Sequence, residues 1–119
     1  MYIIDFYQEA NGKQPIKEYI DILTAKNDKD SKIKQKKIGF YIGMLEKYGT
    51  RIGKPFVDKI KDDIWELRPS GVRIFFFWYD IGAKFILLHY FIKKTQKTPI
   101  REIEQALRNM QDYIKRSQL

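Results

Sequence analysis

Hydrophobic residues recur at two different spacings along this chain, and the spacing separates helices from strands. Apolar positions every three to four residues predict amphipathic helices over residues 14–25 and 30–48. The same spacing predicts a last helix that follows Thr98 and Pro99 and ends near Lys115. We expect Thr98 to be its N-cap and Pro99 its first helical residue.

Runs rich in aromatic and β-branched residues predict strands between the second and last helices. Three consecutive strands are expected over 63–68, 72–79 and 84–92, joined antiparallel. Pro69-Ser70-Gly71 suits a type I turn, and Asp80-Ile81-Gly82 supplies a second reversal.

Two further segments extend this sheet. Residues 1–7 predict an opening strand that adds to it, and residues 51–61 predict a basic loop that leads into a brief strand. Residues 75–79 are all aromatic and break the alternation of a half-buried strand. A central strand that is apolar on both faces explains them, with one face under the helix hairpin and the other partly covered.

The order of elements is therefore β, α, α, three or four β, α. This order predicts an α+β fold, a small antiparallel sheet with an N-terminal helix hairpin packed on it and a C-terminal helix. With 119 residues, 44% of them apolar, the chain suits one domain with one core over residues 1–119, and its composition excludes a disordered chain. It has no cysteine and no apolar run long enough to cross a membrane, so we expect a cytoplasmic protein without disulfides.

The net charge of +8 is concentrated in the predicted sheet and the segment that follows it. Residues 64–101 carry seven basic residues against two acidic ones, whereas the preceding part has 13 against 10 and the following part three against three. Such a local excess is typical of a surface that binds nucleic acid or an acidic protein. Solvated lysines on the rim of a sheet are the alternative for any single residue.

Several kinds of chemistry are excluded by residue types. One histidine and no cysteine make a metal site improbable, and no glycine-rich phosphate loop is present, so no cofactor is expected. A serine triad would need His89 as its base, and nothing in the placement of the three serines supports it. The remaining arginine, lysine, tyrosine and histidine suit RNA cleavage, in which the 2′-hydroxyl of the substrate is the nucleophile.

The basic residues near the strand ends are the candidates for this chemistry. Arg68 and Arg73 suit phosphate binding because a guanidinium engages two phosphate oxygens at once. Lys93 and Lys94 follow the last strand and could join them, and an exposed aromatic residue such as Tyr90 or Phe91 could stack a base. Residues 32–37 hold four more lysines, which we interpret as a solvated helix face in preference to a phosphate contact.

His89 has two possible roles. Strand alternation places it on the same face as Phe85, Leu87, Phe91 and Lys93, where it could act as a general base near the lysine. It could equally be a partly buried histidine bonded to the backbone, and we favour this second role.

Three segments resemble a known family. The stretches ELRPSGVRIFFF (66–77), LLHYFIKKTQKTP (87–99) and EIEQA (102–106) are similar to the RelE/HigB toxins of bacterial type II toxin–antitoxin systems, particularly the phage-derived HigB-like branch with its F-x-K-K-T-x-x-T-P motif. The resemblance implies helices packed on one face of a small antiparallel sheet. It also implies metal-independent cutting of mRNA in the ribosomal A site.

The resemblance further implies partners and residue roles. The partners are the ribosome with its mRNA and a cognate antitoxin, a HigA-like helix-turn-helix protein expected to form a heterotetramer with the toxin, repress its operon and neutralise it. Arg73 matches the arginine that contacts the scissile phosphate, Arg68 the arginine before the turn, and Lys93 with Lys94 the basic pair at the end of the last strand.

The acid/base lysines of RelE do not carry over, because Ile64 and Glu66 stand in that strand. Lys59, Lys61 or His89 could substitute for them. The residues expected to bind RNA are Lys54, Lys59, Lys61, Tyr90, Phe91 and Lys97. We therefore expect a ribosome-dependent mRNA endonuclease toxin, with a ParE-like gyrase inhibitor or a non-catalytic RNA-binding module as alternatives.

Overall fold

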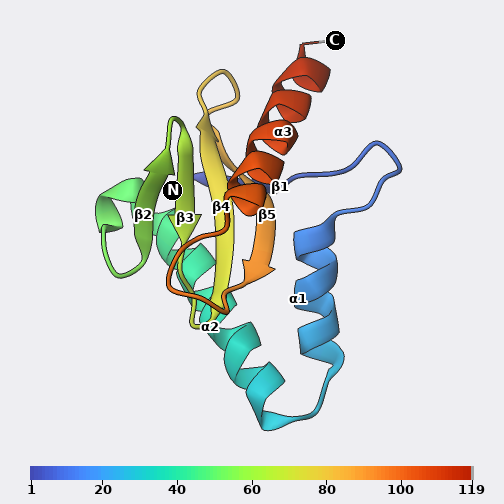
Figure 1. Cartoon of the computed structure of the whole chain (residues 1–119), viewed down its shortest axis with the longest axis vertical. Helices are drawn as coiled ribbons and strands as arrows, with labels where there is room; N and C mark the ends of the chain where they lie inside the picture. The colour runs from blue at the N-terminus through green and yellow to red at the C-terminus, as the bar shows by residue number, and fades with distance from the viewer. Residues whose placement is uncertain (119) are drawn as a thin grey trace.

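A computed structural model describes residues 1–118 and shows a sheet between two layers of helices (Figure 1). The helices are α1 (Pro15–Ala25), α2 (Lys29–Tyr48) and α3 (Ile100–Ser117), and a short 3-10 turn, η1 (Gly49–Ile52), follows α2. The strands are β1 (Ile3–Phe6), β2 (Val57–Lys61), β3 (Ile64–Leu67), β4 (Val72–Tyr79) and β5 (Lys84–Ile92). In this part of the chain no helix is both long and apolar enough to cross a membrane.

The five strands lie in the order β1-β5-β4-β3-β2. The pairs from β2 to β5 are antiparallel, as the sequence predicts, whereas β1 pairs with β5 in parallel. The expected α+β fold, with its helix hairpin, its sheet and its last helix, is confirmed.

The sheet buries side chains on both faces. One face packs against α1 and α2 through Ile16, Ile38 and Leu45, and the other packs against α3 through Ala106 and Met110. Phe75, Phe76 and Phe77 of β4 are at most 3% exposed and divide between these two clusters. The implied packing of helices on one face is therefore wrong for α3, because a central strand that is apolar on both sides needs a cover on both.

The helix ends differ in part from the predicted ones. Asp28 caps α2, its carboxylate accepting hydrogen bonds from the Ser31 backbone N–H and hydroxyl, both at 2.9 Å. Thr98 does not cap α3: the cap residue is Pro99, which makes no side-chain cap bond, and the helix begins at Ile100 and extends two residues past Lys115. The proline ring thus lies just before the first turn, where its fixed φ still suits the helix entry.

Two local irregularities correct the predicted strand geometry. Ser70 has φ 55°, which excludes the expected type I turn, and the Val72 N–H donates to Pro69 O to close this reversal. In β5 the pairing changes from Phe76↔Leu87 to Phe75↔His89, so Leu88 is an extra residue, a β-bulge.

The bulge changes which face the end of β5 presents. Phe85 and Leu87 contact the α1/α2 cluster, whereas Leu88 and Phe91 contact the α3 cluster. The prediction that Phe91 shares a face with Phe85 and Leu87 is wrong, because one extra residue inverts strict alternation.

Candidate active site

Four predicted basic residues line one hollow at an end of the sheet. Arg68 follows β3, Arg73 is the second residue of β4, and Lys93 and Lys94 follow β5. Antiparallel pairing brings these three strand ends together, and the Lys93 N–H donates to Gly71 O at 2.8 Å to fix the exit of β5 against the β3–β4 turn. The hollow has a volume of about 420 Å³, and Thr95 and Gln96 complete its lining.

A buried carboxylate lies between the two arginines. Glu66 of β3 is 3% exposed. Its Oε2 lies 3.7 Å from Arg68 Nε, and its Oε1 lies 3.7 Å from Arg73 Nε. Both distances are longer than a hydrogen bond, and Glu66 Oε1 and Arg73 Nε are buried without a hydrogen-bond partner among the described residues. The three side chains thus form an ion cluster whose hydrogen-bonding capacity is not used up.

Burial and charge act in opposite directions on this cluster. Burial raises the pKa of the Glu66 carboxyl, while Arg73, Arg68 and Lys93 oppose the rise. Burial likewise lowers the pKa of Arg73, and Glu66 opposes that change. In both groups the effect of burial on the pKa is larger than that of the opposite charges, so ion pairing offsets the cost of burying the cluster only in part.

The two arginine side chains differ in how tightly they are held and in how much of each is exposed. Arg73 Nη1 donates to the carbonyls of Ser70 and Val72, at 2.7 and 3.0 Å, and its side chain is 12% exposed. The Arg68 side chain is 32% exposed and also lies 4.0 Å from Asp58. Arg73 is therefore held in place by the β3–β4 turn, whereas Arg68 presents more of its guanidinium to water.

A second hollow, of about 400 Å³, shares both arginines. Its other lining residues come from α2, the segment before β2 and the β3–β4 turn, and they are Lys37, Tyr41, Lys54, Pro55 and Ser70. Lys54, one of the residues expected to bind RNA, thus lines the same hollow as the arginines, and it also lies 3.8 Å from Asp58.

The other predicted RNA-binding lysines lie elsewhere. Lys59 is on β2 with its ammonium 6.0 Å from the centre of the Trp65 ring. Lys61 pairs with Ile64, at the end of β3 away from Arg68. Lys97 is exposed, and its carbonyl accepts a hydrogen bond from Thr95 Oγ1.

Neither predicted stacking aromatic is free. Phe91 is 8% exposed and packs on Phe75, with ring centres 5.4 Å apart, so its expected exposure is wrong. Tyr90 already stacks on Tyr19 of α1, at 4.4 Å with nearly parallel rings. Both rings contribute to packing against helices, which the local sequence does not reveal.

His89 is partly buried, as we favoured, but its partner is a side chain. Its Nε2 lies 2.7 Å from Glu102 Oε1 in the first turn of α3. A carboxylate on one ring nitrogen fixes the orientation of the imidazole. The predicted backbone bond is therefore replaced by a side-chain contact between β5 and α3.

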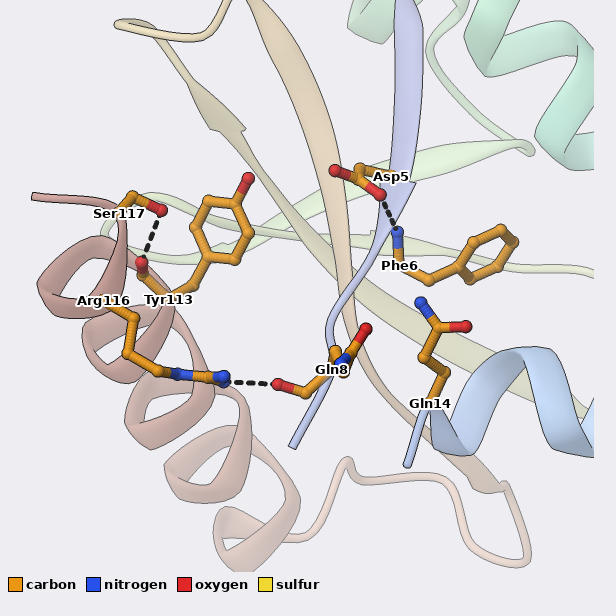
Figure 2. Close-up of a pocket in the computed structure, with 7 residues that line it drawn as sticks. All are labelled: Asp5, Phe6, Gln8, Gln14, Tyr113, Arg116 and Ser117. Atoms are coloured by element: carbon orange, nitrogen blue, oxygen red, sulfur yellow. Dashed lines mark hydrogen bonds between the residues drawn. The ribbon is translucent and has the colours of Figure 1, made fainter. Parts of the chain in front are cut away.

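A third hollow carries none of the predicted site residues. It measures about 280 Å³ and is lined by residues of the β1 region, the start of α1 and the end of α3, including Asp5, Gln14, Tyr113 and Arg116 (Figure 2). Arg116 donates to the Gln8 carbonyl there. Its mixture of charges gives no preference for an anion.

Glu66 is the site residue that sequence reasoning missed as a functional group. A signal for it exists: it alternates with Trp65 and Leu67 in a strand next to an apolar strand, so its carboxylate must be buried and needs a nearby cation. Arg68 and Arg73, on either side of the turn, are the cations that register brings to it.

One known family model covers most of the helices and strands of this chain. The family model described as phage-derived protein Gp49-like (DUF891) matches residues 26–111, which cover α2, all strands but β1, and most of α3. No curated protein matches the chain. Since the match spans well over half of the sequence, this chain belongs to the phage-derived Gp49-like family.

Proposed function

We propose that this protein is the toxin of a type II toxin–antitoxin system and that it cuts translated mRNA on the ribosome without a metal ion. The observation that carries the proposal is the hollow lined by Arg68, Arg73, Lys93 and Lys94, where four cations converge on a space of about 420 Å³. The resemblance of residues 66–77 and 87–99 to RelE/HigB toxins, and the α+β fold, support the same function.

The chemistry needs few protein groups. The 2′-hydroxyl of the nucleotide before the scissile bond attacks phosphorus, a bond from its oxygen to phosphorus forms, and the bond from phosphorus to the 5′-oxygen breaks. The 2′-hydroxyl loses its proton to a base and the departing 5′-oxygen gains one, which leaves a 2′,3′-cyclic phosphate and a 5′-hydroxyl. Charge builds on the phosphate oxygens during attack, and preorganised cations stabilise it.

The residues divide this work. Arg73, held by two backbone carbonyls, supplies a fixed guanidinium for the scissile phosphate, and the more exposed Arg68 supplies a second. Lys93 and Lys94 add charge from the β5 exit. Of the candidates for proton transfer, His89 lies on a strand that leads into the hollow and is oriented by Glu102, whereas Lys59 and Lys61 lie along β2.

The experiment is to induce the protein in growing bacteria and map new 5′-hydroxyl ends on mRNA. Wild type should cut within translated reading frames, and cutting should stop when translation is blocked. Arg73→Ala should lose at least about a hundredfold of the cutting, the scale expected when one charge-stabilising donor is removed. Arg108→Ala is the matched control, because it removes the same charge from an exposed position on α3.

Folding of the variant is checked in parallel. Arg73→Lys keeps the charge but not the two-pronged geometry, so it should remain folded and still cut poorly. Growth arrest with intact mRNA and DNA damage would contradict the proposal and indicate gyrase inhibition. Unchanged cutting by folded Arg73→Ala would remove that residue from the mechanism.

A further inference from the structure

An exposed apolar and aromatic surface on α2 continues from the basic hollows. Ile33, Lys36, Lys37, Phe40 and Tyr41 recur at helical spacing and share one side of α2. With Phe56, which precedes β2, they line a hollow of about 420 Å³. We call these six residues the α2 stripe.

Two apolar side chains of the α2 stripe are open to solvent. Phe40 is 57% exposed and Ile33 is 51% exposed. The centre of the Phe40 ring lies 6.2 Å from that of Phe56 and 6.3 Å from that of Tyr41, and the ring centres of Tyr41 and Phe56 lie 4.8 Å apart. Three aromatic rings in contact, one of them open to solvent, form a platform on which a further ring could stack.

The hollows connect through shared residues. The α2 stripe shares Lys37 and Tyr41 with the hollow that Lys54 lines, and that hollow shares Arg68 and Arg73 with the hollow at the strand ends. Along this path the lining residues include seven cations and no acid: Lys36, Lys37, Lys54, Arg68, Arg73, Lys93 and Lys94. A continuous series of cations suits the regularly spaced phosphates of a nucleic acid strand.

We propose that the α2 stripe binds single-stranded RNA that extends from the phosphate site, with a base stacked on Phe40 and phosphates beside Lys36 and Lys37. This inference rests on the proposed function and names where its substrate strand leaves the site. Aromatic stacking beside a positive groove is how proteins bind single strands without reading sequence. It also gives a role to Lys36 and Lys37, which the sequence alone left as a solvated helix face.

The test measures how affinity depends on RNA length. The full chain is titrated with fluorescent single-stranded oligoribonucleotides of about three and about ten nucleotides, 2′-O-methylated so that they cannot be cut. Wild type should bind the longer one more tightly. Phe40→Ala should weaken binding of the longer one about 5- to 100-fold, from the loss of one stacked base, and leave the shorter one unchanged.

Two further variants separate stacking from charge. Phe40→Trp keeps a flat ring and should retain the affinity, whereas Ile22→Ala, which removes a 55% exposed apolar side chain from α1, is the control and should bind as wild type. For the longer RNA, the logarithm of the binding constant falls with the logarithm of the salt concentration. Lys37→Gln should make this slope shallower by about 0.7, the contribution of one phosphate on a single strand.

The outcomes are separable from those of the cleavage experiment. If Phe40→Ala binds both RNAs as wild type does, or if wild type shows no length dependence, the RNA surface is overturned, and an acidic protein segment becomes its candidate partner. That result leaves the proposed nuclease intact when Arg73→Ala still abolishes cutting. Conversely, a Phe40-dependent length effect in a wild-type protein that cuts no translated mRNA would retain the RNA surface and reject the nuclease.

Discussion

At the scale of single residues, Glu66 decides how the basic site is built. A carboxylate that is 3% exposed would be costly alone, and it is tolerated because Arg68 and Arg73 lie 3.7 Å away on either side. The same arrangement keeps two guanidinium groups close together, which their mutual repulsion opposes. Glu66 is thus a structural counter-charge for the groups that we propose bind phosphate.

Removing this carboxylate should destabilise the protein. We expect Glu66→Ala to lower the free energy of unfolding by about 2–3 kcal/mol, less than the loss for a fully buried pair because Arg68 reaches water. Urea denaturation measures the change. The control is Asp58→Ala, whose carboxylate is 37% exposed and lies 4.0 Å from Arg68, and it should cost less than about 1 kcal/mol. Equal effects of the two variants would contradict the assignment.

At the scale of elements, a glycine inside α2 and the glycine that ends it have opposite effects on stability. Gly49 ends α2 with φ 68°, and a β-carbon there would lie 2.9 Å from the Tyr2 ring. Gly43 is inside the helix, and a β-carbon there would meet no atom within 4 Å. The first glycine is required by conformation and space, whereas the second only adds chain entropy to the unfolded state.

Two alanine substitutions should therefore act in opposite directions. Gly49→Ala should reduce the free energy of unfolding by about 1–3 kcal/mol, because the residue would be strained and would push against Tyr2. Gly43→Ala should increase it by about 0.5–1 kcal/mol. Thermal unfolding followed by circular dichroism measures both. A stabilised Gly49→Ala variant would show that the helix end is not fixed as described.

The elements also show what sequence reasoning can and cannot reach. Helices, strands and the cluster of Arg68, Arg73, Lys93 and Lys94 follow from spacing, because antiparallel strands joined by short turns bring their ends together. The bulge at Leu88 could not be predicted, because β5 carries apolar residues on both faces and no change in their pattern marks it. The face of the sheet on which Phe91 lies depends on this bulge. The partner of His89 depends on where α3 packs, which no local pattern specifies.

At the scale of the whole molecule, side-chain contacts join the segment after β1 to α3. Tyr7 follows β1, and its hydroxyl donates to Asp112 of α3 at 2.6 Å, while Arg116 contacts the same carboxylate and the Gln8 carbonyl. The Tyr7 and Arg116 contacts hold the pKa of Asp112 below its ordinary value. Burial, followed by Asp112, raises the pKa of Tyr7.

This contact makes stability depend on pH in a predictable direction. A carboxyl whose pKa is lowered by folding stabilises the protein above its unfolded pKa, near 3.8, and the contribution is lost as pH falls through the folded value. We expect Tyr7→Phe to lose about 0.5–1.5 kcal/mol near neutral pH. The difference from wild type should narrow below about pH 3.8, as urea denaturation at several pH values would show. A constant difference down to pH 2 would contradict the role of the ionised carboxylate.

The position of β5 in the sheet also sets an order in time for a chain made from its N-terminus. β1 is synthesised before the other strands, but its partner in the sheet, β5, lies some eighty residues later. Lys93 and Lys94 follow β5, so the arginines of the earlier strands face an incomplete cluster until that point. In a nascent chain that stops before β5, the edge of β4 that pairs with β5 is therefore unpaired. Such a chain also lacks two of the four cations that line the hollow at the strand ends. Activity that depends on this cluster begins only after β5 and the two lysines that follow it have been synthesised.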